Sequence, residues 1–270
     1  MQCIFCKHDS NDSRSIEHII PESLGNESHI LPKGVVCDKC NNYFSRKVEK
    51  PFLDLEVMKI LRFHQIIPSK RGNIPPVEAT IGSNYPATVI KRMKDPYLFS
   101  IELCPTAFEY AKNTKEGKVM IPAGAPLPVG PVVSRFLAKV ALEAMAQKLI
   151  KNPAGIEYLV NEIQLDSLRN HARYAQNNEW PFYSRRIHDP DKLWINENGN
   201  KVQVVHEFDI FKTEVGELYF VLSIFGMEFA INYAGPAIDG YIQWLKDNDN
   251  ASPLYYGKNS ESLIKGKTED

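Results

Sequence analysis

The chain has 270 residues, of which 43% are hydrophobic and 24% charged, and its formal net charge is −1. This length accommodates a small module together with a larger domain that buries a core of its own. The near-neutral charge argues against a protein that coats nucleic acid, so any contact with nucleic acid has to be local.

Two Cys-x-x-Cys pairs frame the N-terminal part of the chain. They are Cys3 with Cys6 and Cys37 with Cys40, while Cys104 stands alone. Each pair forms a tight turn that aims two thiolates at one point, and two such turns supply the four ligands of a tetrahedral zinc ion. No hydrophobic leader precedes Cys3, and no apolar run approaches the roughly 20 residues of a membrane span. We therefore expect a cytoplasmic protein without membrane contact, in which a structural zinc replaces disulfides.

Between the two cysteine pairs, the pattern predicts two short strands joined by a turn. Residues 15–20 favour the first strand, residues 24–26 the turn, and residues 30–36 a returning strand that Pro32 and Gly34 interrupt. Two strands alone bury too little apolar surface to be stable, so the zinc has to take the place of a core.

A helix follows the second cysteine pair. Asp38 is a candidate cap, and residues 41–50 have helical polarity until Pro51, which interrupts or restarts the helix. Apolar residues at helical spacing continue the pattern, and they are Leu53, Val57, Ile60 and Leu61. We expect a second helical segment that joins the module to the rest of the chain.

A polar, proline-rich stretch at residues 68–76 predicts the main domain boundary. Beyond it, strands are expected near residues 77–82, 87–93 and 98–103, followed by a short helix at 106–113.

The middle of the chain predicts helices. An apolar stripe at helical spacing consists of Val133, Phe136, Leu137, Val140 and Ala144. Arg135 and Lys139 lie four residues apart on another face of this helix, and a second helix should cover residues 155–172.

The period then changes to two, which predicts an antiparallel meander. Its strands cover residues 202–210, 218–225 and 227–231. Turns are expected near Gly216 and Gly226, and a last helix at residues 237–246. Together with the preceding segments, this pattern indicates the α+β class.

Glu17 and His18 lie between the cysteine pairs, and Asn41 directly follows the last cysteine. A Glu-His pair alone is usually an ordinary surface dipeptide, but this placement favours a site. Hydrolysis of a phosphodiester needs an activated water and a cation that neutralises charge on the phosphate. His18 titrates near neutral pH and is a candidate general base, while Glu17 and Asn41 offer hard oxygen ligands that suit Mg²⁺ or Mn²⁺. Adjacent residues of a strand face opposite ways. Glu17 and His18 can therefore flank one phosphate only if the strand bends, and Pro21 predicts that bend.

The order of the two cysteine pairs, the Glu-His-Ile-Ile-Pro stretch at residues 17–21 and the Asn-Asn at residues 41–42 resembles the HNH endonucleases. Members of that family have a ββα-metal core, here braced by a four-cysteine zinc. The resemblance covers about the first 50 residues. It implies that His18 is the general base, that Glu17 and Asn41 hold one catalytic divalent metal, and that cleavage leaves a 5′-phosphate and a 3′-hydroxyl.

The chain departs from this family at the middle asparagine of the motif, which lies shortly before the second cysteine pair. Residues 30–34 read Ile-Leu-Pro-Lys-Gly instead, and Asn26 or His29 is the candidate for the orienting role. Arg46 and Lys47 are candidate phosphate contacts, although paired basic residues are more often solvated surface.

The predicted organisation has three parts. Residues 1–67 form a zinc-braced ββα-metal nuclease module with its connecting helix. Residues 77–257 form a larger α+β domain that recognises a substrate or partner, and residues 258–270 a polar tail.

The resulting hypothesis is a metal-dependent endonuclease that hydrolyses phosphodiester bonds in DNA, with double-stranded DNA as the favoured substrate. It would use structural Zn²⁺ and catalytic Mg²⁺ or Mn²⁺. Many relatives serve restriction, phage defence or mobile elements. The alternative is a zinc-braced nucleic-acid-binding module, or an effector subunit without nuclease activity of its own. The sequence leaves open whether the chain forms a homodimer or acts with a partner protein.

Overall fold

The structure is a computed structural model that describes residues 1–82, 84–114, 117–152, 154–175 and 180–258. Contacts divide the chain into two compact units. Unit 1 consists of Met1–Pro21, Asn26–Phe52 and Leu127–Asp270, and unit 2 of Glu22–Gly25 and Leu53–Pro126. Both contain helices and antiparallel sheets, which confirms the predicted α+β class. Among the described residues, no helix has the length and hydrophobicity needed to cross a membrane.

The N-terminal part of unit 1 has the predicted strand, strand, helix order. Strands β1 (Glu17–His18) and β2 (Ile30–Leu31) pair antiparallel, and helix α1 (Asp38–Phe44) follows. Both strands are shorter than predicted, since the ladder holds only two residue pairs. After α1, the helix continues as a π-helical segment, Ser45–Glu49, and then as α2 (Lys50–Leu53). Pro51 therefore does not interrupt the helix.

The cap of α1 differs from the prediction. Cys37 is the N-cap residue, and its sulfur accepts a hydrogen bond from the backbone N–H of Cys40 at 3.4 Å. The Asp38 carboxylate instead accepts from the backbone N–H groups of Arg14 and Ser15. Asp38 therefore ties the segment before β1 to the start of the helix.

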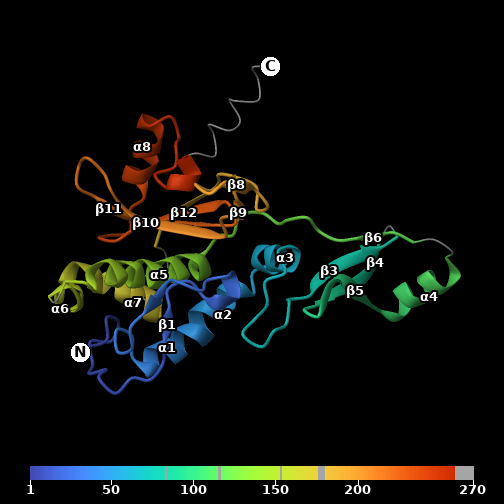
Figure 1. Cartoon of the computed structure of the whole chain (residues 1–270), viewed down its shortest axis with the longest axis horizontal. Helices are drawn as coiled ribbons and strands as arrows, with labels where there is room; N and C mark the ends of the chain where they lie inside the picture. The colour runs from blue at the N-terminus through green and yellow to red at the C-terminus, as the bar shows by residue number, and fades with distance from the viewer. Residues whose placement is uncertain (83, 115–116, 153, 176–179, 259–270) are drawn as a thin grey trace. The chain divides into compact units, whose positions relative to one another are not determined.

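The centre of unit 1 is a four-stranded antiparallel sheet with strand order β10-β11-β12-β7. Its strands are β7 (Phe182–Arg186), β10 (His206–Lys212), β11 (Leu218–Ile224) and β12 (Met227–Asn232). Figure 1 shows helix α5 (Pro131–Leu149) along one face of this sheet and helix α8 (Asp239–Asp247) on the other. Tyr241 and Leu245 of α8 pack against Tyr219 and Val221 of β11. The neighbouring strand residues alternate to the opposite face, where α5 covers them.

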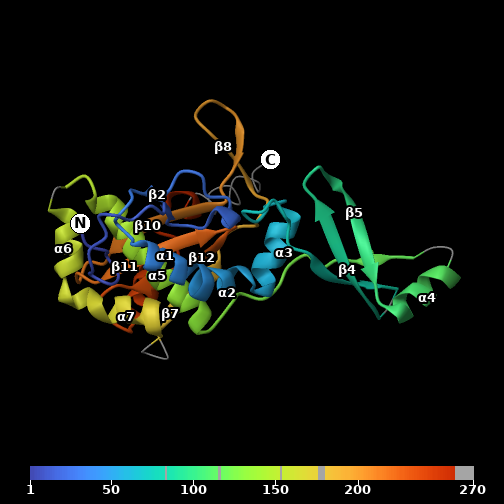
Figure 2. The same cartoon turned by 90° about the horizontal axis from the view of Figure 1, so that it is seen from below.

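Helix α5 is buried around most of its circumference. The predicted stripe is buried, and so are residues outside it, Ser134, Lys139 and Glu143 among them. Tyr233, just after β12, donates a hydrogen bond from its hydroxyl to the Ala141 carbonyl at 2.8 Å. In the two views of Figures 1 and 2, α5 runs between the sheet and the segment that carries β1 and α1.

The predicted single helix at residues 155–172 is wrong, because the chain forms two helices there. Helix α6 (Gly155–Asn161) ends at Glu162, whose backbone is extended, with ψ 108°. A 3₁₀ turn, Ile163–Leu165, and helix α7 (Asp166–Tyr174) follow. The Glu162 side chain accepts from the N–H of Gln164 and so starts the new turn.

The predicted antiparallel meander is present, with turns at both glycines, but residues 202–210 do not form one strand as predicted, because residues 201–203 belong to another sheet and β10 begins at His206. β11 and β12 are joined by the two residues Phe225 and Gly226, which have φ of 49° and 75°. Positive φ at both positions is the signature of a type I′ hairpin turn. A second hairpin joins β8 (Leu193–Ile195) to β9 (Lys201–Gln203).

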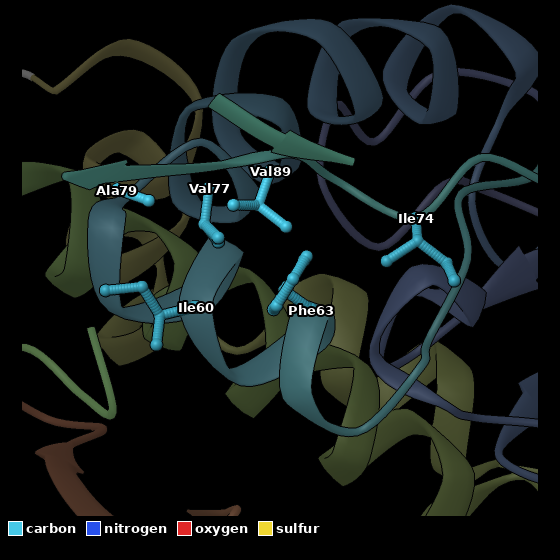
Figure 3. Close-up of a cluster of buried hydrophobic side chains, with 6 residues drawn as sticks. All are labelled: Ile60, Phe63, Ile74, Val77, Ala79 and Val89. Carbon is cyan, nitrogen blue, oxygen red and sulfur yellow. The ribbon is translucent and has the colours of Figure 1, made fainter. Parts of the chain in front are cut away.

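Unit 2 is a four-stranded antiparallel sheet with order β5-β4-β3-β6, packed against a helix. Its elements are the 3₁₀ turn Glu22–Leu24, α3 (Glu56–His64), β3 (Val77–Ile81), β4 (Tyr85–Arg92), β5 (Asp95–Leu103), α4 (Pro105–Asn113) and β6 (Val119–Met120). Figure 3 shows Ile60 and Phe63 of α3 beside the strand residues Val77, Ala79 and Val89. These elements confirm the predicted strands and the short helix.

The compact units do not follow chain order. Residues 1–52 group mainly with the C-terminal half, and residues 68–76 lie inside unit 2. The predicted boundaries at 1–67 and 77–257 stay a prediction, because compactness in space does not decide which segment folds or acts alone. The predicted tail from residue 258 lies, after its first residue, outside the described part of the chain.

Two glycine substitutions test the hairpin geometry. A side chain at Gly226 would collide with the backbone carbonyl of His188, whereas the space beside Gly216, with φ 93°, is open. Gly226→Ala should lower the free energy of unfolding by about 2–3 kcal/mol, and Gly216→Ala by only about 1 kcal/mol, since strain alone acts there. Urea unfolding measures both. Equal losses would contradict the close approach of His188.

Candidate metal centre and catalytic site

The four paired cysteines converge on one point. Their sulfur atoms all lie within 4.8 Å of one another, and among the described residues this is the group of Cys, His, Asp or Glu side chains that could hold a metal ion. A tetrahedron with Zn–S bonds of about 2.3 Å has edges of about 3.8 Å. The sulfurs of Cys6 and Cys37 are 3.6 Å apart.

Backbone N–H groups point at these sulfurs. The Cys37 N–H donates to Cys3 Sγ at 3.3 Å, and Lys7, with φ 59°, closes the first turn through its N–H and the Cys3 carbonyl. The hydrogen bond with Cys40 lowers the pKa of Cys3 to about 4, while that bond and burial raise the pKa of Cys40. A packed set of thiolates with N–H donors fits zinc, which favours sulfur and tetrahedral geometry.

The side chains of Glu17 and His18 project from opposite faces of the β1–β2 ladder. Glu17 lies opposite Leu31 and is 5% exposed, whereas His18 lies opposite the exposed Ile30 and is half-buried. β1 ends at His18, and a bend follows before Pro21. The bend that Pro21 predicted is therefore present, although β1 ends two residues before the predicted end of the strand at residue 20.

The Glu17 carboxylate meets a buried lysine. The Lys139 ammonium forms ion pairs with Glu17 at 2.7 Å, Glu49 at 2.6 Å and Glu143 at 2.9 Å. It also donates to the His18 carbonyl at 3.3 Å. The side chains of Lys139 and Glu143 are 0% exposed. One ammonium of α5 therefore contacts both residues of the Glu17-His18 pair.

Burial opposes the charge of Lys139, but the three carboxylates outweigh it and hold its pKa well above the usual range. Burial and the charge of Glu17 raise the pKa of Glu143 well above its usual range. The Lys139 ammonium thus keeps its charge among these acidic groups.

Asn41 lies against the strand that carries Glu17. Its Nδ2 donates to the Ile16 carbonyl at 3.1 Å, which turns Oδ1 away from that carbonyl. Lys139 bridges Glu17 and Glu49, and Glu49 lies on the π-helical continuation of the helix that carries Asn41. One carboxylate and one amide oxygen fit the hard-donor preference of Mg²⁺, and ligating carboxylates are commonly held by an outer partner as Lys139 holds Glu17.

The two candidates for the orienting role differ in their contacts. Asn26 is 1% exposed, and its Nδ2 donates to the carbonyls of Ile20 and His29 at 2.6 and 3.0 Å. Its Oδ1 accepts from the N–H groups of Ser28 and His29 at 3.1 and 2.9 Å. Asn26 therefore closes the loop that returns from β1 to β2.

His29 packs against the central sheet. Its ring centroid lies 4.7 Å from Phe208 and 5.4 Å from His206. Burial and the charge of His29 lower the pKa of His206 to about 4, so the His206 ring is neutral near pH 7. These contacts give His29 a packing partner in β10 rather than a partner in β1.

A basic hollow lies on another face of α1. Its cavity has about 300 Å³ and is lined by Lys39, Asn42, Tyr43, Arg46, Arg173 and Tyr174. Among the described residues, no carboxylate lines it, and the Arg173 guanidinium stacks over the Tyr174 ring at 4.8 Å from the centroid. Of the two predicted phosphate contacts, Arg46 lines this hollow, and Lys47 is exposed beside it without lining it.

Sequence reasoning missed Lys139 and Arg173 as members of these sites. The available signal for Lys139 was a lysine four residues before a glutamate inside an otherwise apolar helix, since such charges are buried only as pairs. For Arg173 the chain order gives no signal, because the other residues of the hollow, apart from Tyr174, are more than a hundred residues away.

Cys40→Ser tests the metal centre, with Cys104→Ser as the matched control outside the cluster. The wild-type protein and the control should carry about one zinc ion per chain, and Cys40→Ser should lose it and unfold at a lower temperature. Elemental mass spectrometry and thermal unfolding give both readings. Full zinc content in Cys40→Ser would contradict the assignment.

Comparison with known proteins agrees with this geometry. Residues 3–54 match a family of HNH endonucleases. No curated protein and no solved structure matches the chain. The matched segment contains the four-cysteine cluster, β1, β2 and α1, which confirms the resemblance seen in the sequence. Residues 3–54 are thus a domain of the HNH endonuclease family, which supports a nuclease of the HNH type acting on nucleic acid.

Proposed function

We propose that the protein is a metal-dependent endonuclease that hydrolyses phosphodiester bonds in double-stranded DNA. The observation that carries this proposal is the ββα unit at the HNH-matched segment, in which Asn41 bonds the backbone directly before Glu17 and His18. Cys3, Cys6, Cys37 and Cys40 hold the structural zinc, and Asn41 is joined to that centre through Cys40. A role in restriction, phage defence or mobile elements rests on the resemblance alone.

His18 acts as the general base in this proposal. Its half-buried ring at the end of β1 accepts a proton from water, whose oxygen then forms a bond to phosphorus. The bond from phosphorus to the 3′ oxygen breaks, and that oxygen takes up a proton from solvent, which leaves a 3′-hydroxyl and a 5′-phosphate. Glu17 and Asn41 would hold a Mg²⁺ or Mn²⁺ ion, which would neutralise charge on the phosphate and on the leaving oxygen.

Asn26 positions His18 through the backbone. Its four hydrogen bonds fix the loop between Ile20 and His29, and the N–H of Ile19 bonds the His29 carbonyl at 3.0 Å. The residue after His18 is therefore held against the returning strand. This supports Asn26 over His29 for the role of the family's middle asparagine.

The basic hollow would bind the DNA backbone. Lys39, Arg46 and Arg173 bring three cations to a cavity that no carboxylate of the described residues lines, and Tyr43 and Tyr174 add aromatic surface. Cations that are not neutralised by acidic neighbours attract phosphate most strongly. Local positive charge of this kind reconciles a DNA substrate with a net charge of −1.

His18→Ala tests the catalytic assignment. Supercoiled plasmid incubated with the zinc-loaded protein and Mg²⁺ or Mn²⁺ should be nicked or linearised, and His18→Ala should reduce the rate by about 100-fold or more, the usual contribution of a general base. His64→Ala, a substitution of an exposed histidine in unit 2, should cut at the wild-type rate. Retained cutting by His18→Ala would contradict the assignment of His18 as the general base. Preferential cutting of single-stranded DNA or RNA would contradict double-stranded DNA as the substrate.

Arg46→Gln combined with Arg173→Gln tests the basic hollow. Binding of a fluorescent DNA duplex without divalent metal should weaken about tenfold, and the dependence of log K on log salt should become shallower by about 2, one step for each lost phosphate contact. Lys201→Gln combined with Lys246→Gln changes the charge equally at exposed sites elsewhere and should leave binding unchanged. Equal effects of the two pairs would indicate general charge attraction only.

A binding module without nuclease activity is the second candidate. One observation favours it, namely that the Glu17 carboxylate is already paired with the Lys139 ammonium, which competes with a metal cation. On this reading the chain binds nucleic acid as an effector subunit. Tight DNA binding by zinc-loaded protein that no Mg²⁺, Mn²⁺ or partner converts into cleavage would select it.

A further inference from the structure

The Lys139 ammonium brings together chain segments that are far apart in the sequence. It contacts Glu17 and the His18 carbonyl of β1, Glu49 at the end of the π-helical segment, and Glu143 one turn along α5. Its side chain is 0% exposed. A buried ammonium keeps this geometry because each lost partner leaves a charge without compensation.

These contacts restrict the Glu17-His18 pair at two points, one on a side chain and one on the backbone. The ion pair fixes the Glu17 carboxylate, and the hydrogen bond to the His18 carbonyl fixes the backbone that directs the His18 ring. β1 contains only these two residues, so its own ladder gives little rigidity. The second anchor of the strand therefore comes from α5, outside the segment that matches the HNH family.

We infer that Lys139 is a positioning residue of the nuclease site, which acts by holding Glu17 and His18 in the geometry needed for metal binding and catalysis. This inference rests on the proposed function. It means that α5 completes a site whose metal ligands and base all come from residues 3–54. Outer partners of metal ligands typically contribute about 10–100-fold to metal affinity or activity.

The neighbouring cation on the same helix provides a matched control. Arg135 lies one turn before Lys139, and its guanidinium bonds the Tyr43 hydroxyl and the carbonyls of Ala172 and Arg173. It therefore joins α5 to α1 and α7 without a contact to β1 among these bonds. Arg135→Gln removes a half-buried cation of α5 and destabilises packing, but leaves the Lys139 contacts in place.

The experiment measures Mn²⁺ binding to zinc-loaded protein by electron paramagnetic resonance, together with plasmid cleavage as a function of Mn²⁺ concentration. The variants are Lys139→Gln, Lys139→Arg, Arg135→Gln and Glu17→Gln. Zinc content and melting temperature are recorded for each, so that loss of folding is separated from loss of positioning.

Lys139→Gln should raise the Mn²⁺ dissociation constant about 10–100-fold and shift the cleavage midpoint equally, with part of the rate restored at saturating Mn²⁺. Lys139→Arg, which keeps the cation, should stay within a few-fold of wild type. Arg135→Gln should lower the melting temperature without shifting the Mn²⁺ midpoint. A purely structural role of Lys139 would instead give a loss that follows the unfolded fraction and that Mn²⁺ does not restore.

Three outcomes would overturn the inference. They are wild-type Mn²⁺ affinity in folded Lys139→Gln, an equal shift in Arg135→Gln, and unchanged affinity in Glu17→Gln, which would remove Glu17 as a ligand. If Lys139→Gln does not fold, Lys139→Met with Glu143→Leu replaces the ion pair on α5 by apolar packing, and the same shift is expected. The proposed function fails separately, through retained cleavage by His18→Ala.

Discussion

A buried ammonium among three carboxylates is the constraint on which the nuclease part of unit 1 depends. Lys139 cannot reach water, and it keeps its charge only while Glu17, Glu49 and Glu143 surround it. Moving such an ion pair out of water is unfavourable, and removal of one partner typically destabilises a protein by about 3–5 kcal/mol. β1, the helix after the second cysteine pair, and α5 are thereby held in one arrangement, and the stacked rings of Phe52 and Phe136 add apolar packing between that helix and α5.

The four-cysteine centre also holds β1 and the helix after the second cysteine pair, through contacts separate from those of Lys139. It joins the N-terminal turn to the start of α1, and the chain then runs from Cys40 to Asn41, whose amide returns to the Ile16 carbonyl. β1 is therefore fixed at one end through the cysteines and at the other through Lys139. In the proposed function, soft sulfur ligands would serve the scaffold, and hard oxygen donors would remain for the chemistry. This division would let a two-residue strand present a base in a defined position.

Much of this arrangement follows from the sequence, because cysteine spacing and hydrophobic period are local signals. They predicted the metal cluster, the strand, strand, helix order, the sheet of unit 2 and the meander. The role of Lys139 was not predicted, because helical periodicity assigns a charged residue beside an apolar stripe to the exposed face of the helix. In the structure, α5 is buried around most of its circumference. The choice between Asn26 and His29 needed the fold, since it depends on which carbonyls and rings the loop approaches. The helix break at Glu162 also has no local signal beyond a capping side chain.

The π-helical segment Ser45–Glu49 has a consequence for the phase of the helix. Glu49 follows Asn41 by eight residues. In an uninterrupted α-helix of 3.6 residues per turn, this separation would rotate Glu49 about 80° past the face of Asn41. A π-helical turn takes more residues and rotates less at each of them, so it removes part of that excess. The π-helical turn thus brings the phase of Glu49 closer to that of Asn41, so that one side of a helix carries the amide proposed to bind a cation and, two turns later, the carboxylate that pairs with Lys139.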